Sequence, residues 1–157
     1  MFSNTFSKGN LTQMSQIIDL EKLLKEENII RIKPQGYSMY PLFIPGRDEA
    51  LIEAVTPSEL RRGDVALYRR DQGILVLHRI CRIDASGFYM VGDNQYEIEG
   101  PLRKDQIRGK LIGFIRNGKE FSVRNPFYRL LSSLWLLLLP LRPICFKVSA
   151  ALKHFLK

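Results

Sequence analysis

The sequence is poor in the residues that mark metal centres and disulfide-stabilised proteins, with two cysteines and two histidines among 157 residues. Cys81 and Cys145 lie far apart and lack the spacing of metal ligands, so they indicate neither a metal site nor a disulfide framework. We expect both to be buried free thiols. No metal and no cofactor are implied.

Glycine-rich phosphate loops, dinucleotide fingerprints, internal repeats and low-complexity tracts are also missing from the sequence. Their absence excludes the common nucleotide-binding classes. Hydrophobic residues make up 45% of the chain, which excludes general disorder. The length fits one domain with its own core plus terminal appendages.

Acidic residues are missing from residues 121–157, which contain six lysines or arginines, so six of the eight net positive charges belong to this tail. The apolar run from Leu130 to Leu141 is shorter than the roughly 20 residues that a straight spanning helix needs. Trp135 lies in its middle, and Pro140 and Pro143 interrupt the pattern. A basic, tryptophan-bearing apolar tail of this kind is typical of an interfacial or re-entrant anchor on anionic lipid.

A single long span is disfavoured for this tail, because Arg142 and Lys147 would lie inside it at roughly 2.5 to 3.5 kcal/mol each. A pair of helices packed on the domain or on a partner chain remains the alternative. Nucleic-acid binding is disfavoured because the bases are interleaved with leucines rather than laid along a polar face. We predict that residues 124–157 associate with a membrane, through lipid or a membrane protein. The sequence does not indicate which side of the membrane the protein occupies.

The amino-terminal segment lacks a long apolar run. From about Leu11 to Glu27, isoleucines and leucines mix with charged residues at a spacing that suits an amphipathic helix. The charges argue against a signal peptide or a membrane span. We therefore expect residues 1–28 to form a helical segment that packs on the rest of the protein.

The middle of the chain, residues 29–123, is predicted to be mainly β. Turn sequences such as Asp71-Gln72-Gly73 and Ala85-Ser86-Gly87 separate short apolar runs, and Asn117-Gly118 predicts a two-residue hairpin. This pattern predicts twisted antiparallel sheets or an open barrel. The expected strands cover Ile29 to Lys33, Ala50 to Val55, Asp64 to Arg69, Ile74 to Ile83, Phe88 to Val91, Ile107 to Ile115 and Glu120 to Val123.

A serine, a histidine and an aspartate occur in this middle part in an order that suits nucleophilic catalysis. Ser38 lies in a turn-like hexapeptide, and His78 and Asp93 follow it. A serine hydroxyl attacks a carbonyl well only when a base removes its proton, and imidazole suits that role at neutral pH. Gly36 permits an unusual backbone angle that can expose the hydroxyl. Taken singly, each residue is more commonly structural, since such serines and Gly-Asp-Asn sequences are ordinary in turns.

Five short strings surround these residues: Gly36 to Pro41, Pro45 to Asp48, Arg62 to Tyr68, Leu77 to Ile80 and Val91 to Asn94. In order and spacing they resemble the catalytic domain of the signal peptidase I and LexA-like superfamily of serine peptidases, over about Arg31 to Arg116. Bacterial signal peptidases and LexA-type autoproteases use a lysine as the base, whereas endoplasmic-reticulum and archaeal signal peptidases use a histidine. The chain is therefore most similar to the Ser/His branch.

The resemblance implies a role for each matching residue. Ser38 would be the nucleophile and its backbone N–H an oxyanion donor, His78 the general base and later the general acid, and Asp93 the carboxylate that orients the imidazole. Two positions depart from the family. Gly36 stands where signal peptidases often have a serine that assists the oxyanion hole, and Glu99 stands where the Ser/His members tend to have a second aspartate. Glu99 is therefore our second candidate for the orienting carboxylate.

The activity implied by the resemblance is that of a membrane-associated serine endopeptidase that cleaves signal or leader peptides, with a peptide or preprotein as substrate. One alternative is a catalytically inactive peptide-binding or membrane-scaffold module on the same sheet, which Gly36 and Glu99 favour. Another is self-cleavage as in LexA-like repressors. The short segment before the sheet and the histidine at position 78 disfavour that alternative.

Overall fold

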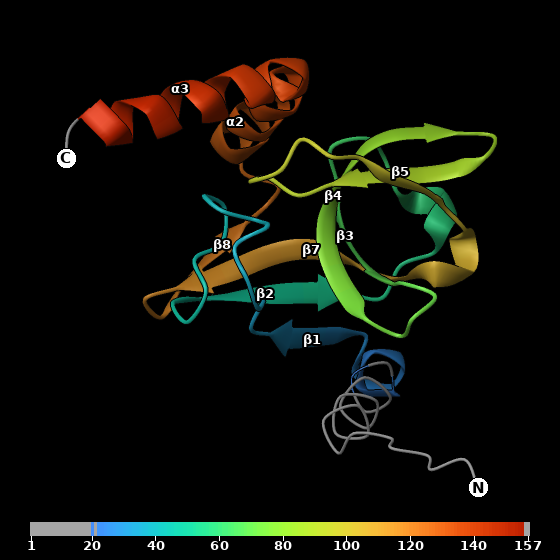
Figure 1. Ribbon diagram of the computed structural model, residues 1–157. Helices are drawn as coiled ribbons and strands as arrows, with labels where there is room; N and C mark the ends of the chain where they lie inside the picture. The colour runs from blue at the N-terminus through green and yellow to red at the C-terminus, as the bar shows by residue number, and fades with distance from the viewer. Residues whose placement is uncertain (1–19, 21, 156–157) are drawn as a thin grey trace, which may run out of the picture.

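The computed structural model describes residue 20 and residues 22–155, with side chains described as far as residue 148. This part of the chain is mainly β, as predicted, and forms one antiparallel sheet of eight strands that does not close into a barrel (Figure 1). The spatial order is β1-β2-β7-β3-β4-β5-β6, with β8 added to β7. The strands are β1 (Ile29–Ile32), β2 (Asp48–Glu53), β3 (Val65–Arg69), β4 (Leu75–Asp84), β5 (Gly87–Val91), β6 (Glu99–Leu102), β7 (Ile107–Arg116) and β8 (Lys119–Ser122).

Each of the seven expected strands overlaps a strand of the sheet, and β6 is an additional one. Sequence patterns miss β6 because its two central residues, Gly100 and Pro101, are both disfavoured in strands. The strand pairs with β5, and Glu99 lies opposite Met90. This pairing brings Glu99 into the sheet, which matters for the site described below.

The hairpin between β7 and β8 forms at Asn117-Gly118 as predicted. Both residues have positive φ, 51° for Asn117 and 73° for Gly118, which is the conformation that a two-residue turn of this type requires. Arg116 and Lys119 form the last pair of the ladder. The turn chemistry alone therefore fixed this connection.

Alternation of side chains along β3 divides the apolar interior into two clusters. Val65 and Leu67 belong to the first cluster, and Ala66 and Tyr68 to the second. The first cluster consists of Leu24, Ile30, Met39, Phe43, Ala50, Ile52, Val65, Leu67, Leu77, Leu111 and Phe114. The second consists of Leu60, Ala66, Tyr68, Ile80, Phe88, Met90, Leu102 and Ile107.

The helix expected at the amino terminus falls largely outside the described residues. Residues 22–27 are helical, and Leu24 is 4% exposed in the first cluster. This part of the segment therefore packs on the sheet as predicted. Two 3-10 turns, η1 (Pro57–Glu59) and η2 (Lys104–Gln106), lie before β3 and β7.

The carboxy-terminal segment forms α2 (Pro126–Leu137), the 3-10 turn η3 (Leu139–Leu141) and α3 (Arg142–Phe155). Asn125 starts α2, because its side-chain oxygen accepts the N–H of Phe127 at 2.9 Å. Within the described residues, neither helix alone has the length and apolar content to cross a membrane. Taken together across their 51° bend, Pro126–Leu137 and Leu139–Val148 do have both. The break between two apolar pieces matches the sequence pattern.

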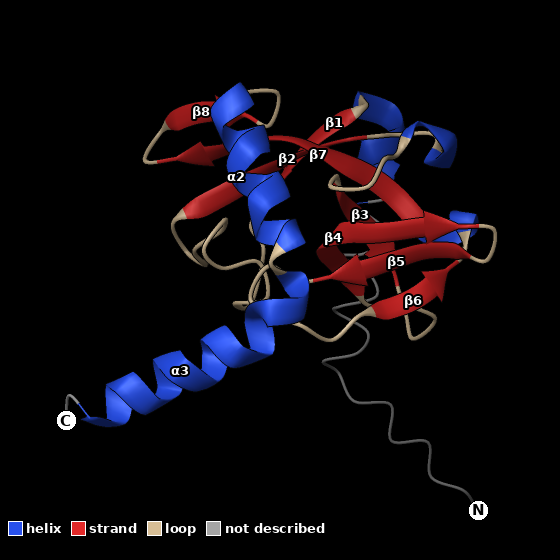
Figure 2. Cartoon of the chain, turned by 90° about the horizontal axis from the view of Figure 1, so that it is seen from above, coloured by secondary structure: helices blue, strands red, loops and turns tan. Residues whose placement is uncertain are grey.

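Helix α2 lies against the sheet, whereas α3 extends away from it (Figure 2). The ring of Tyr128 lies 6.3 Å from that of Phe114, and Leu136 packs with Cys81 and Val91 in a third small cluster. Cys81 is buried as expected. The expectation for Cys145 was wrong, because this thiol is exposed on α3.

Candidate functional site

Ser38 lies in a turn between β1 and β2 that packs on the apolar core. Met39 is 3% exposed in the first apolar cluster, and its carbonyl accepts the N–H of Phe43 at 2.8 Å. Gly36 has φ = 77°, in the left-handed region, so the unusual backbone angle expected there is confirmed. The turn thus leaves Ser38 partly exposed above a buried neighbour.

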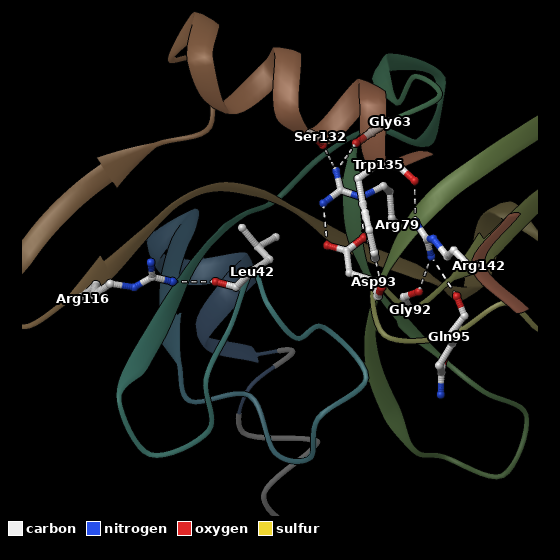
Figure 3. A network of polar contacts seen from close by, with 10 residues as sticks. All are labelled: Leu42, Gly63, Arg79, Gly92, Asp93, Gln95, Arg116, Ser132, Trp135 and Arg142. Atoms are coloured by element: carbon white, nitrogen blue, oxygen red, sulfur yellow. Dashed lines mark hydrogen bonds and ion pairs between the residues drawn. The ribbon is translucent and has the colours of Figure 1, made fainter. Parts of the chain in front are cut away.

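The chain that leaves this turn is fixed by a buried carboxylate. Asp48 is 1% exposed and accepts hydrogen bonds from the guanidinium groups of Arg47 and Arg116. Burial alone would raise the pKa of Asp48, but these hydrogen bonds outweigh burial and lower it well below its usual range. Arg116 also donates to the carbonyl of Leu42 at 2.7 Å (Figure 3). The segment after Ser38 is therefore tied to β7.

Ser38 and His78 border the same cleft, which has a volume of about 510 Å³. Gly36, Leu77 and Gln95 also line it. The Ser38 hydroxyl makes no hydrogen bond to His78 or to any other described residue. Catalytic contacts of this kind are commonly long in substrate-free enzymes and tighten when substrate binds. Ser38 and His78 therefore line one cleft without contacting each other.

The His78 ring is held from the side by a chain of polar groups. Ala66 of β3 lies opposite His78 of β4, so Tyr68, two residues further along β3, is a diagonal neighbour on the same face. The Tyr68 hydroxyl lies 3.2 Å from Nδ1 of His78 and donates to Oε2 of Glu99 at 2.7 Å. Arg70 completes the chain with two hydrogen bonds to Glu99, at 2.7 and 2.6 Å.

These contacts fix which nitrogen of His78 carries the proton. The Tyr68 hydroxyl has one proton and gives it to Glu99, because an ionised carboxylate can only accept. The hydroxyl oxygen must then accept from His78, so Nδ1 carries the hydrogen of the neutral ring. The lone pair is left on Nε2, to which no described residue donates. A general base for a serine hydroxyl needs this tautomer.

Burial sets the charge of the ring. His78 is 4% exposed, and its removal from water lowers its pKa to about 4, although Glu99 opposes part of that shift. Burial would raise the pKa of Glu99, but hydrogen bonds from Arg70 and Tyr68 outweigh burial and lower it. At neutral pH the site therefore holds a neutral imidazole beside an ionised carboxylate.

Asp93 lies elsewhere. Both of its oxygens are taken by the guanidinium of Arg79, at 2.8 and 2.7 Å, and both side chains are 2% exposed. His78 and Arg79 are consecutive residues of β4, so their side chains point to opposite faces of the sheet. Arg79 pairs with Val91, which puts Asp93 on the Arg79 side. In this structure Asp93 does not orient His78, and the second candidate, Glu99, reaches the ring through Tyr68.

Sequence reasoning missed Tyr68, Arg70 and Arg79 as parts of this site. A signal was available for two of them: Tyr68 and Arg79 are polar side chains next to apolar residues in strands, which indicates buried polar partners. The partner of Tyr68 could not be predicted, because Glu99 enters the sheet only through β6. Arg70 gave no signal, since it lies just beyond β3 in a turn.

The backbone of Ser38 offers a further polar group at the cleft. The N–H of Ser38 donates to no other described residue, so it is available to a developing oxyanion. Among the described residues, no three His, Cys, Asp or Glu side chains gather in a way that would hold a metal ion. In comparisons with known proteins, no family model matches the chain and no curated protein matches it. The interpretation of the site therefore rests on its own geometry.

Proposed function

We propose that this protein is a serine endopeptidase that cleaves a signal or leader peptide, on a sheet of the signal peptidase and LexA type. Ser38 is the nucleophile and His78 the general base. The observation that carries the proposal is that both residues line one cleft, with the histidine in the tautomer that leaves Nε2 to accept a proton.

The reaction begins when Oγ of Ser38 attacks the carbonyl carbon of the scissile bond and its proton passes to Nε2 of His78. The resulting oxyanion is stabilised by the N–H of Ser38. His78 then gives the proton to the leaving amine, and the acyl-enzyme remains on Ser38. A water molecule, deprotonated by His78, attacks the ester, and His78 then returns this proton to Oγ of Ser38 as the acid leaves.

Glu99 and Tyr68 support the proton transfer to His78. When Nε2 takes the proton, the ring becomes positive while its Nδ1–H still donates to Tyr68, which donates to Glu99. The nearby carboxylate favours this positive charge, and its effect on the pKa of His78 is in the upward direction. The Glu99–Tyr68 pair therefore takes the part that a single aspartate has in a Ser-His-Asp triad.

Cleavage of synthetic signal-peptide substrates by the wild type, Ser38→Ala and His78→Ala tests the proposal. We expect cleavage by the wild type alone. His154→Ala serves as the matched control because it removes the chain's other histidine, and it should retain full activity. Equal activity in all variants would remove these residues from any enzymatic role and favour a peptide-binding module. A shortened chain after incubation without substrate would indicate self-cleavage.

We also propose that the carboxy-terminal helix pair binds an anionic membrane surface. Nine of its apolar side chains are between 40% and 68% exposed, which is unusual for a monomeric protein in water. Three exposed bases, Arg124, Arg129 and Lys147, accompany them, and residues 121–157 contain no acid. The exposed apolar residues are Phe127, Leu130, Leu131, Leu134, Leu137, Leu138, Leu141, Ile144 and Val148.

Point substitutions test this surface better than removal of the tail, since α2 also contributes buried side chains to the domain. Leu137 and Ile144 are 68% and 60% exposed. Replacing either by aspartate should weaken binding to phosphatidylserine-containing vesicles about tenfold or more, because each leucine-sized side chain contributes roughly 1.5 to 3 kcal/mol on burial. Ile83→Asp, an exposed apolar site on β4, is the control. Equal binding by all three variants would reject the anchor.

A further inference from the structure

The loop formed by residues 92–95 lies between the carboxy-terminal helices and the Ser38 turn. On the helix side, one nitrogen of Arg142, Nη1, donates to the carbonyl of Gly92 at 3.0 Å and to that of Gln95 at 2.8 Å. The other, Nη2, donates to the carbonyl of Trp135 at 3.0 Å. A single guanidinium thus joins α2, the start of α3 and both ends of the 92–95 loop (Figure 3).

Trp135 adds a second attachment to the same loop. Its indole N–H donates to the carbonyl of Asp93 at 2.9 Å, and its ring lies under the guanidinium of Arg142, with 4.8 Å between the guanidinium carbon and the ring centroid. Arg79, which holds the Asp93 side chain, also donates to the hydroxyl of Ser132 on α2. Three of the four residues in the loop are therefore bound through their main-chain carbonyls to the helix pair.

On its other side the same loop contacts the Ser38 turn directly. The N–H of Asn94 donates to the carbonyl of Ser38 at 2.8 Å. A Cβ atom added to Gly92 would lie 2.6 Å from that carbonyl oxygen, so the two backbones touch. Gln95, whose carbonyl is bound by Arg142, also lines the cleft. The loop therefore contacts both the helix pair and the Ser38 turn.

Arg142 is an unusual residue to bury here. It is 0% exposed and forms no ion pair with a carboxylate in the described part of the chain, and burial lowers its pKa. A hydrophobic side chain of similar length would fill the space without the penalty of a buried charge. A lysine ammonium carries its three donors on one nitrogen, whereas the planar guanidinium of Arg142 places donors on two, so that Nη1 reaches Gly92 and Gln95 while Nη2 reaches Trp135. The contacts made by Arg142, rather than its volume, therefore explain its placement.

We propose that Arg142 is a positioning residue for Ser38, and that the carboxy-terminal helix pair is consequently part of the catalytic unit as well as a membrane-binding element. The inference rests on the peptidase function proposed above. Arg142 fixes the 92–95 loop, and Asn94 in that loop fixes the carbonyl of the nucleophile. Loss of the guanidinium releases the Ser38 turn while leaving the sheet and the His78 side of the cleft in place.

The test uses the full-length protein in detergent with Arg142→Ala, Arg142→Lys and Trp135→Phe. Two quantities are measured: the amide exchange rate of Asn94 and the values of kcat and KM for a signal-peptide substrate. Lys119→Ala is the control, because it removes an exposed base outside the helix pair. Amides of β2 and β7 report whether a variant has unfolded as a whole.

For Arg142→Ala we expect exchange at Asn94 at least about tenfold faster and kcat at least about tenfold lower, with KM nearly unchanged, since small misplacements of reacting groups have effects of this size. Arg142→Lys keeps the charge but not the fork, so it should restore little. Trp135→Phe keeps an aromatic ring and loses one hydrogen bond, so we expect smaller changes in Asn94 exchange and in kcat, in the same directions. Lys119→Ala should match the wild type.

Wild-type exchange at Asn94 and wild-type kcat in both Arg142→Lys and Trp135→Phe would overturn the proposal, even if Arg142→Ala fails to fold. The exchange measurement needs no substrate. A wild type without peptidase activity would therefore count against the proposed function, whereas unchanged exchange at Asn94 would count against Arg142.

Discussion

The Tyr68 hydroxyl lies 3.2 Å from Nδ1 of His78, and because it gives its own proton to Glu99, it accepts the proton of the ring. A phenol thus stands between the imidazole and the carboxylate, where a Ser-His-Asp site has direct contact. The contact assigns a tautomer to His78 without reference to any substrate. It can therefore be tested by spectroscopy as well as by kinetics.

Tyr68→Phe removes the acceptor of the Nδ1 proton while it retains the ring. We expect the ¹⁵N shifts of His78 to change from a protonated Nδ1 to a mixture of tautomers, and kcat to fall about tenfold to hundredfold, the range for partial loss of general-base function. Tyr89→Phe, which removes a hydroxyl from β5 and leaves the ring under Arg82, is the control. An unprotonated Nδ1 in the wild type would contradict the assignment.

Glu99→Gln and Asp93→Asn should distinguish the roles of the two carboxylates, because the first should affect mainly kcat and the second mainly stability. Glu99→Gln alters the group that supports His78, so we expect lower kcat with modest loss of stability. Asp93→Asn leaves the buried Arg79 without its charged partner, and breaking such a pair destabilises proteins by roughly 3 to 5 kcal/mol. Urea unfolding and steady-state kinetics on both variants measure this. Loss of kcat in Asp93→Asn at unchanged stability would restore Asp93 as the orienting residue.

The pH dependence of catalysis follows from the buried histidine. A base is active when unprotonated, and the pKa of His78 is lowered to about 4 by burial. We therefore expect kcat/KM to stay level from neutral pH down to about 5 and to fall as the pH approaches 4, roughly two and a half units below the fall expected of an ordinary histidine. A half-maximal point near 6.5 would show that the ring is solvated in the active form.

The same pKa affects stability with a definite sign. Above pH 6.5 the ring is neutral in both the folded and the unfolded chain, so it has no effect on the pH dependence. As the pH falls from 6.5 to about 4, the unfolded chain binds a proton that the folded chain does not. The free energy of unfolding should then decrease by up to about 1.4 kcal/mol per pH unit. His78→Gln should lack this component in a series of urea titrations.

Gly92→Ala should act on Ser38 through the backbone. The added Cβ would lie 2.6 Å from the carbonyl oxygen of Ser38 and 2.5 Å from the Oε1 atom of Gln95, closer than such atoms approach in proteins. We expect kcat to fall by about tenfold or more and stability to fall by roughly 1 to 3 kcal/mol. Gly46→Ala is the control, since it introduces strain at φ = 79° without any neighbour within 4 Å. Activity should survive in the control and not in Gly92→Ala.

Local sequence signals determined most of the sheet. Seven strands could be placed from runs of β-branched and aromatic residues, and Asn117-Gly118 specified its hairpin because both positions require positive φ. β6 was not predicted because Gly100 and Pro101 are both disfavoured in strands, and only its pairing with β5 makes it a strand. The two apolar pieces of the tail were equally visible, since Pro140 lies in the break between α2 and α3 and Pro143 in the first turn of α3, where a proline is tolerated.

For the site, the sequence by itself determined that a serine turn and a histidine-bearing strand are present, and their residue types limited the chemistry. The tertiary structure decided which carboxylate serves the histidine. His78 and Arg79 are neighbours in the chain, but alternation along β4 sends them to opposite faces, so Asp93 meets Arg79 while Glu99 approaches His78 through Tyr68. The contacts of Arg142 were equally unpredictable from the sequence. This base lies in an apolar tail, and only the folded chain brings the carbonyls of a distant loop to it.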